Sequence, residues 1–254
     1  MLNIDLTGKV ALVTGGAGQL GRAIVRTLGK CGADIVVHFN QSEDMASCLV
    51  AEMRAYGRRA TCIPADITDR ESVFKMKKAI SAGMDDPDII VNNAVIQYDW
   101  VSVLEQGVED YKSQFRSCVL QNVLMAQAFV PAMIEKGWGR VIGINTECAM
   151  QCFPSQSAYV AGKRGMDGVL RVLAKEVGKH NITVNQVAPG WMISDRHREA
   201  GTEVQPEYEK SVPLGHRGTD QDIANLVAFL ASDLAAFITG AYIPVAGGNV
   251  MPTI

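Results

Sequence analysis

Short runs of β-branched and other apolar residues alternate along the chain with longer amphipathic segments. Six runs are apolar at most positions, and they lie at residues 10–15, 34–39, 60–66, 88–94, 140–145 and 182–190. Near-continuous apolar strands are typical of a parallel sheet that helices cover on both faces. The runs therefore predict the strands of a buried parallel sheet.

The segments between these runs have the length and periodicity of helices, and they lie at residues 19–31, 42–56, 69–82, 107–136, 157–179 and 219–232. Alternating strands and helices form βαβ units, which predict an α/β fold of the Rossmann type: a doubly wound parallel sheet with helices on both faces. The 254 residues contain neither a linker rich in Pro, Gly and Ser nor an internal repeat. We therefore expect a single dinucleotide-binding domain over residues 1–254.

Residues 191–217 interrupt the alternation with a charged, weakly periodic segment that follows the sixth run. Open α/β sheets bind their substrates beyond the carboxyl ends of the strands. This position favours a substrate lid, although a solvated connecting loop would have the same composition.

The composition is that of an ordinary globular protein, with 48% apolar residues, 20% charged residues and a net charge of −3. The slight negative balance argues against a protein that coats nucleic acid by electrostatics. No window of 18 apolar residues and no signal-peptide pattern is found, and the six cysteines follow neither a disulfide framework nor a metal-binding spacing. We expect a cytoplasmic protein with no metal site and no nucleic-acid or membrane partner.

A glycine-rich turn, TGGAGQLG at residues 14–21, follows the first apolar run and precedes a helical segment. Glycines at positions 15, 18 and 21 allow a tight turn and keep side chains away from a pyrophosphate held at the helix N-terminus. An ordinary turn would also be glycine-rich, but the strand before it and the helix after it are the context that a dinucleotide site requires. We expect this turn to bind a nucleotide.

Tyr159 and Lys163 are four residues apart in a predicted helix, and Thr146 follows the fifth run. Positions i and i+4 share one helix face, so the phenol and the ammonium can point into one cleft. A nearby ammonium stabilises the phenolate and lowers the pKa of the tyrosine, and the Thr146 hydroxyl can orient a reacting oxygen. A surface Tyr–Lys pair is the more common meaning of this spacing taken alone.

These motifs resemble, in their order and spacing, the short-chain dehydrogenase/reductase family in its compact branch, which includes the 3-oxoacyl reductases. The resemblance covers residues 7–250 and rests on the glycine-rich turn, Asn92-Asn93-Ala94, Thr146, the Tyr159–Lys163 pair and the VAPG sequence at 187–190. It implies an NAD(P)-dependent oxidoreductase that transfers a hydride between the nicotinamide and a carbonyl or secondary alcohol carbon.

The resemblance also implies roles for individual residues. Tyr159 would be the catalytic acid/base, Lys163 would lower its pKa and hold the nicotinamide ribose, and Thr146 would take the place of the family's usual Ser. Contacts with the cofactor are implied for Gly15, Gly18, Gln19, Leu20, Gly21, Asn40, Asp66, Ile67, Asn93, Ala94, Tyr159, Lys163, Pro189, Gly190 and Met192.

Three positions near the implied site depart from the family pattern. Gln19 replaces a usual Gly, and the remaining glycines have the spacing of the longer sugar-nucleotide branch, whose C-terminal substrate domain this chain has no residues to form. Val95 introduces bulk after Asn93-Ala94, where the family usually has Gly. Cys118 stands where the family places an Asn that holds a water behind the Lys.

Cys118 is therefore a fourth candidate catalytic residue. A thiol is only a weak hydrogen-bond donor and acceptor, so the proton relay would be altered. Asn122 would replace it only if the helix were irregular, and no His stands in a position to activate Cys118 as a nucleophile.

The end of the second run, Phe39-Asn40-Gln41-Ser42, bears on the choice of cofactor. Phe39 occupies the position where NAD-dependent members carry Asp, and Asn40 can hydrogen-bond a 2′-phosphate. This favours NADP(H) over NAD(H), although the next two residues, Glu43 and Asp44, are acidic.

Substrate contacts are expected from Trp100, Cys148, Phe153 and Trp191, which suggest an apolar small molecule such as a ketoacyl, steroid or aromatic ketone. The resemblance also implies a homotetramer or homodimer that associates through helices 107–136 and 157–179. A protein that binds the nucleotide without turnover, as a sensor or assembly partner, is the alternative, because Val95 and Cys118 depart from the family pattern.

Overall fold

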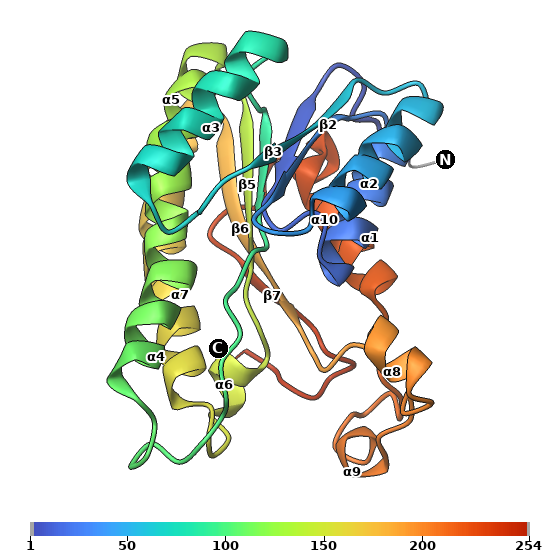
Figure 1. The fold of residues 1–254 in the computed structure, drawn as a ribbon, viewed down its shortest axis with the longest axis vertical. Helices are drawn as coiled ribbons and strands as arrows, with labels where there is room; N and C mark the ends of the chain where they lie inside the picture. The colour runs from blue at the N-terminus through green and yellow to red at the C-terminus, as the bar shows by residue number, and fades with distance from the viewer. Residues whose placement is uncertain (1–2, 253–254) are drawn as a thin grey trace.

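The computed structural model describes residues 3–252 apart from the side chain of Arg196, so the first and last two residues of the predicted domain lie outside the described residues. Within this range the chain forms a seven-stranded sheet in the order β3-β2-β1-β4-β5-β6-β7, and all neighbouring strands are parallel (Figure 1). The strands are β1 Val10–Val13, β2 Asp34–Phe39, β3 Ala60–Pro64, β4 Ile89–Asn92, β5 Gly139–Ile144, β6 Ile182–Pro189 and β7 Tyr242–Val245. The predicted doubly wound fold is confirmed.

Each of the six apolar runs contains one strand, and the sequence pattern missed only β7 among these seven. β7 pairs with β6 at the edge of the sheet, and its four residues are only half-buried. An edge strand has less apolar surface to bury and can accommodate a proline such as Pro244, so its hydrophobic signal is weak.

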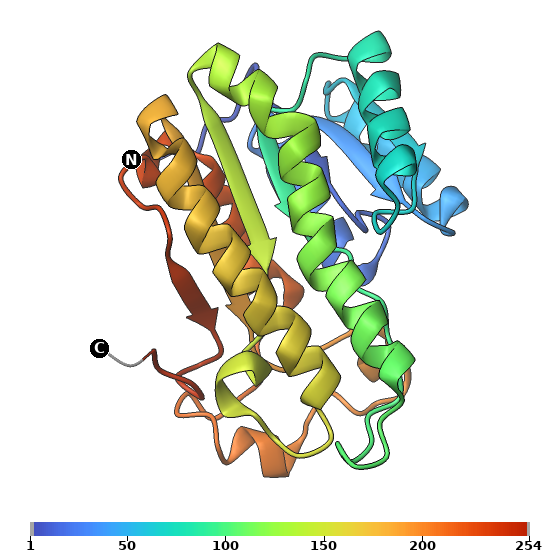
Figure 2. The ribbon, with the colours of Figure 1, turned by 90° about the vertical axis from the view of Figure 1, so that its left-hand side faces the viewer.

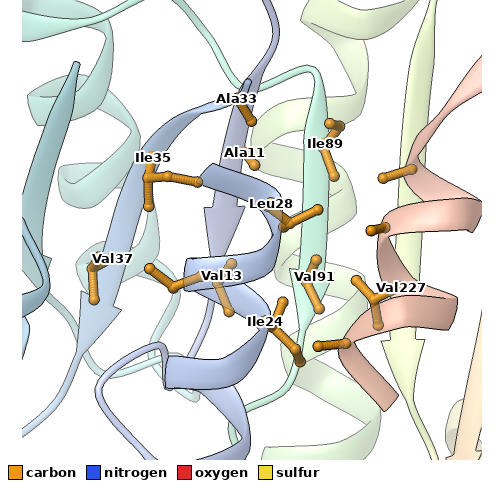
Figure 3. Packing of buried hydrophobic residues seen from close by; sticks show 14 of the residues in the cluster. Ala11, Val13, Ile24, Leu28, Ala33, Ile35, Val37, Ile89, Val91 and Val227 are labelled. Atoms are coloured by element: carbon orange, nitrogen blue, oxygen red, sulfur yellow. The ribbon is translucent and has the colours of Figure 1, made fainter. Parts of the chain in front are cut away.

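Helices cover both faces of the sheet, as the amphipathic segments predicted. One face packs against α1 Gln19–Lys30, α2 Glu43–Ala55 and α10 Asp220–Ala231, and the other against α3 Arg70–Gly83, α5 Gln121–Lys136 and α7 Ser157–Val177. The short α4 Val108–Gln114 packs against α7. Figure 3 shows Ile24 and Leu28 of α1 directed at β1, β2 and β4, beside Val227 of α10. Figure 2 shows α5 and α7 running side by side over the opposite face.

The predicted helix 107–136 is not regular, because a π-helical turn at Phe115–Leu120 joins α4 to α5. Polar side chains compete for backbone carbonyls in this turn: Gln121 Nε2 donates to Ser117 O at 2.5 Å, and Asn122 Nδ2 donates to Cys118 O at 2.6 Å. Residues Val108–Lys136 are long and apolar enough to cross a membrane, but 61% of the most apolar window is buried inside the protein, as expected for a core helix.

The remaining helices are short, and three of them lie near the carboxyl ends of the strands: α6 Cys148–Gln151, α8 Asp195–Glu199 and α9 Pro206–Glu209. Residues 191–217, which contain α8 and α9, extend beyond the end of β6 (Figure 1). Arg217 fixes this segment, because its guanidinium donates to the carbonyls of Trp191, Met192 and Glu203. The charged segment is therefore folded onto the edge of the sheet that carries the candidate site.

Candidate active site

A cleft of about 590 Å³ lies at the carboxyl ends of the strands, where the strand order reverses between β1 and β4. This is where doubly wound sheets bind nucleotides. Of the residues predicted to contact the cofactor, the cleft is lined by Gly15, Gly18, Gln19, Leu20, Gly21, Asn40, Asp66, Ile67, Asn93, Ala94, Tyr159, Lys163 and Pro189. Gly190 lines a neighbouring cavity, and Met192 lines neither.

The glycine-rich turn between β1 and α1 is packed too tightly for side chains. Gly15 has a φ of +60°, and a Cβ at Gly21 would lie 2.2 Å from the carbonyl oxygen of Gly15. Gly18 is the N-cap of α1 and provides no side-chain cap, so the first N–H groups of the helix face the cleft. The turn therefore fits the pyrophosphate of a dinucleotide cofactor.

Gln19 adds little to this cradle. Its amide nitrogen donates to Asp220 Oδ2 at 2.7 Å and to the carbonyl of Ile193 at 3.3 Å. The Gln side chain thus connects α1 to α10 and to the segment after β6. Its amide N–H groups are directed at these partners.

His38 at the end of β2 hydrogen-bonds the backbone of the glycine-rich turn, a role that the sequence did not indicate. The Gly15 N–H donates to His38 Nδ1 at 3.0 Å, so Nε2 carries the ring proton and donates to the Ala65 carbonyl at 2.9 Å. Only 1% of the His38 surface is exposed, and burial lowers its pKa below the usual 6.5. The neutral imidazole therefore holds the Gly15 N–H in place.

His38 should make the stability of the protein depend on pH. Because its pKa is lowered in the folded state, below about pH 6.5 the unfolded chain binds a proton that the folded chain does not, and stability falls as the pH falls by at most about 1.4 kcal/mol per pH unit. Asn in place of His38 keeps an acceptor oxygen but does not titrate. We expect the melting temperature to fall less between pH 7 and pH 5.5 in His38→Asn than in the wild type, and equal falls would exclude His38 as the cause.

A second polar cluster joins the turn to the end of β4. Thr14 Oγ1 donates to Gln121 Oε1 at 2.7 Å and accepts the N–H groups of Asn93 and Ala94 at 2.9 and 3.1 Å. Gln121 Nε2 donates in turn to the Ala94 carbonyl at 2.9 Å. Gln121, the first residue of α5 after the π-helical turn, thus fixes the backbone of the predicted cofactor residues Asn93 and Ala94.

Tyr159 and Lys163 lie on α7 with Thr146 beside them. Lys163 Nζ lies 5.7 Å from the centre of the Tyr159 ring and donates to the Ile144 carbonyl at 2.6 Å. The pKa of Tyr159 is raised, chiefly by burial and only partly offset by a hydrogen bond from Thr146, so the lowering expected from Lys163 is not seen. Burial lowers the pKa of Lys163. Trp100 stacks on the Tyr159 ring with a centroid distance of 5.9 Å. The structure therefore brings together Tyr159, Lys163 and Thr146, three of the four residues predicted to be catalytic.

Cys118 also reaches this group. It is buried, and it lies close enough to Tyr159 and Lys163 for its ionisation to affect the pKa of both. The helix is irregular at the π-helical turn, which is the condition under which Asn122 could take the role of Cys118. The amide of Asn122, however, accepts from Asn92 Nδ2 and donates to the Cys118 carbonyl. Cys118 therefore lies within electrostatic range of the Tyr–Lys pair, while the amide of Asn122 is already engaged by Asn92 and Cys118.

A second cavity of about 390 Å³ adjoins the cleft and is lined by Thr146 and Tyr159. All four residues predicted to contact the substrate also line it: Trp100, Cys148, Phe153 and Trp191. The sequence did not indicate two further lining residues, Glu147 and Tyr208. Tyr208 comes from the charged segment 191–217, so this segment contributes a wall of the cavity.

A nucleotide cleft next to a cavity that shares the half-buried Tyr159 is the arrangement of a Rossmann-type oxidoreductase site. Comparison with known proteins agrees, since residues 15–249 match the family model described as Enoyl-(Acyl carrier protein) reductase. The chain belongs to the short-chain dehydrogenase/reductase family.

Relatives of full length support this assignment. The 3-oxoacyl-(acyl-carrier-protein) reductase FabG of Pseudomonas aeruginosa is 36% identical and aligns with 98% of this chain and 100% of its own length. The enzyme of the same name from Aquifex aeolicus is 32% identical, with 97% and 99% covered. The crystal structure of a blue fluorescent protein from a metagenomic library in complex with NADPH superposes with a TM-score of 0.89 and 34% identity, covering 97% of this chain and 100% of that chain.

The compact branch is therefore confirmed over the longer sugar-nucleotide branch. The chain is an NAD(P)-dependent oxidoreductase that acts on a carbonyl or secondary alcohol, and the non-catalytic alternative is not supported.

Proposed function

We propose that this protein is an NADP(H)-dependent carbonyl reductase in which Tyr159 is the catalytic acid/base. One observation carries the proposal: among the described residues, Tyr159 is the only titratable side chain that lines both the nucleotide cleft and the adjoining cavity. A proton donor at this boundary can reach the oxygen of a carbonyl whose carbon faces the cofactor.

The proposed proton transfer uses the chain's own residues. The bound cofactor supplies the hydride that is added to the carbonyl carbon. The Tyr159 hydroxyl donates its proton to the carbonyl oxygen, Thr146 hydrogen-bonds the same oxygen, and the Lys163 ammonium stabilises the phenolate that remains. Addition of the hydride and of this proton gives a secondary alcohol, and proton uptake by the phenolate then restores Tyr159.

NADP(H) is supported by the FabG relatives and by the NADPH-bound structural neighbour. Phe39, Asn40, Gln41 and Ser42 line the cleft, and none of them is an acid that would repel a 2′-phosphate. The glycine-rich turn would hold the pyrophosphate, and Asp66 and Ile67 would lie along the adenosine. We propose that NADP(H) is preferred over NAD(H).

The proposed substrate is a largely apolar ketone bounded by Trp100, Cys148, Phe153 and Trp191, as these side chains line the second cavity. The decisive experiment measures consumption of NADPH and of NADH with β-ketoacyl thioesters, steroid ketones, diketones and aromatic ketones. We expect turnover with NADPH on at least one of these classes. Tight NADPH binding without turnover on any of them would contradict the proposal.

Cys118 should limit the rate of proton uptake, because a thiol holds a relay water less well than an amide does. Cys118→Asn is expected to raise kcat by roughly 10-fold, part of the contribution of a general acid–base step. Cys118→Ala is the matched control, since it removes the thiol without adding an amide, and it should give no gain. An unchanged or lower kcat in a folded Cys118→Asn enzyme would show that the thiol does not limit the relay.

We also propose that the enzyme is a cytoplasmic homotetramer or homodimer that associates through α5 and α7. Side chains from both helices line an apolar groove, and Ile134 and Val172 on this face are exposed. Exposed apolar surface of this kind is typical of protein interfaces.

A further inference from the structure

The substrate cavity combines aromatic walls with one acid. Six of its lining side chains are aromatic: Tyr98, Trp100, Phe153, Tyr159, Trp191 and Tyr208. Among the described residues, Glu147 is the only charged side chain that lines the cavity, and it immediately follows Thr146 in the chain. The acid therefore lies close to the place proposed for the reacting oxygen.

Glu147 is held by neutral donors alone. Its carboxylate accepts the Tyr208 hydroxyl at 2.7 Å and the Asn249 amide at 3.0 Å. Only 3% of its surface is exposed, and among the side chains that the structure describes no lysine, arginine or histidine forms an ion pair with it. The backbone N–H of Trp191 is a third neutral donor to this carboxylate. A carboxylate has about four acceptor positions, so these three donors leave one for a ligand.

Arg217 is one cationic side chain at the wall of the cavity, because its guanidinium lies 4.6 Å from the Trp191 ring. Its N–H groups, however, are directed at the backbone carbonyls of Trp191, Met192 and Glu203. The guanidinium therefore hydrogen-bonds the backbone of the segment after β6, and it forms no ion pair with the Glu147 carboxylate.

A buried carboxylate without a cation is costly, since neutral hydrogen bonds offset only part of its lost hydration. Aromatic rings attract cations to their negative faces, and this attraction grows when water is excluded. Both features favour a positively charged ligand. A neutral apolar ketone would leave the acid buried and unpaired.

We propose that the substrate carries an ammonium group near its carbonyl, so that the enzyme interconverts an amino ketone and an amino alcohol, with Glu147 as the residue that selects the ammonium. The proposal rests on the proposed function, because it places the carbonyl at Tyr159. It narrows the substrate from an apolar ketone to an aryl or alkyl ketone with one cationic substituent.

Three ketones of nearly equal size test this inference: 2-aminoacetophenone with its amine on the side-chain carbon, 2-hydroxyacetophenone and propiophenone. They present an ammonium, a hydroxyl or a methyl group at the same position. We expect kcat/KM with NADPH to be roughly 10- to 100-fold higher for the ammonium compound than for propiophenone, as for a hydrogen bond to a charged group. Equal values for all three, or a preference for the hydroxyl compound, would overturn the proposal and leave the proposed function intact.

Variants separate the carboxylate from the inherent reactivity of the amino ketone. Glu147→Gln should lower the ammonium-to-methyl ratio of kcat/KM by roughly 10-fold or more. Glu207→Gln, which removes a carboxylate in α9 whose side chain is 88% exposed, should leave the ratio unchanged. Tyr208→Phe removes a donor but keeps the acid, so it should retain the preference if Glu147→Gln does not fold. A ratio that is unchanged in folded Glu147→Gln would overturn the proposal.

Binding provides a readout that does not need turnover. Calorimetric titration of 2-amino-1-phenylethanol into the protein with NADP⁺ should show binding that Glu147→Gln weakens by a similar factor. If no ketone of any class is reduced, the proposed function fails, and this titration still decides whether the cavity selects an ammonium. Absence of binding to the wild-type protein would overturn the inference.

Discussion

Replacing Tyr159 with Phe is expected to lower turnover by about 10²- to 10⁴-fold, the usual contribution of a general acid–base group, while NADPH still binds. The variant loses only the hydroxyl that would donate the proton to the carbonyl oxygen. The ring remains able to stack on Trp100, and Lys163 keeps its hydrogen bond to the Ile144 carbonyl. Rates of NADPH consumption and a fluorescence titration of NADPH measure the two effects separately.

Tyr56→Phe is a suitable control, because Tyr56 ends α2 with 48% of its surface exposed. It should leave both rate and affinity unchanged. Substantial activity in Tyr159→Phe would mean that another group is the catalytic acid/base. Tyr98 would then be the first to test, since its hydroxyl lines the same cavity and accepts the Tyr159 N–H at 2.7 Å.

The order of strands and helices could be predicted because buried parallel strands need apolar residues at nearly every position. Five of the six predicted helices begin and end within about two residues of the observed bounds, the usual uncertainty of helix ends. The exception is 107–136, where the π-helical turn at Phe115–Leu120 depends on Gln121 and Asn122 competing for backbone carbonyls. An amphipathic pattern contains no information about that competition.

The candidate site could be predicted where a motif constrains the backbone or fixes the spacing along one helix. The glycine-rich turn and the Tyr159–Lys163 pair belong to this class, and so does the location of Cys118, which follows from counting along the helix. Glu147 and His38 could not be found in this way. Each is a single polar residue in or after an apolar run, and its partners lie far away in the sequence.

The charged segment 191–217 illustrates the same limit. Its composition was equally consistent with a solvated loop, and only its position favoured a role at the site. The structure places Tyr208 of this segment against Glu147, 61 residues earlier in the chain. Contacts over such distances depend on tertiary packing, so the sequence indicated the right part of the sheet but not the residue.

Gly21→Ala is expected to cause the largest loss of cofactor affinity. A Cβ at this position would lie 2.2 Å from the Gly15 carbonyl oxygen and 2.8 Å from Gly16 Cα, both of them backbone atoms of the turn. The turn must move to accept the methyl group, and the N–H groups that would hold the pyrophosphate move with it. We expect the Kd for NADPH to rise at least ~100-fold, about 2.7 kcal/mol, in a fluorescence titration.

Gly83→Ala provides the matched control, because a Cβ there meets nothing within 4 Å at the end of α3. It should leave the Kd unchanged and stabilise the helix slightly. Melting temperatures of both variants distinguish a local change in the turn from a general loss of folding. NADPH affinity within a few-fold of wild type in a folded Gly21→Ala protein would mean that the pyrophosphate is held elsewhere. The assignment of the cleft between β1 and β4 would then have to be abandoned, because every other proposed cofactor contact is placed relative to this turn.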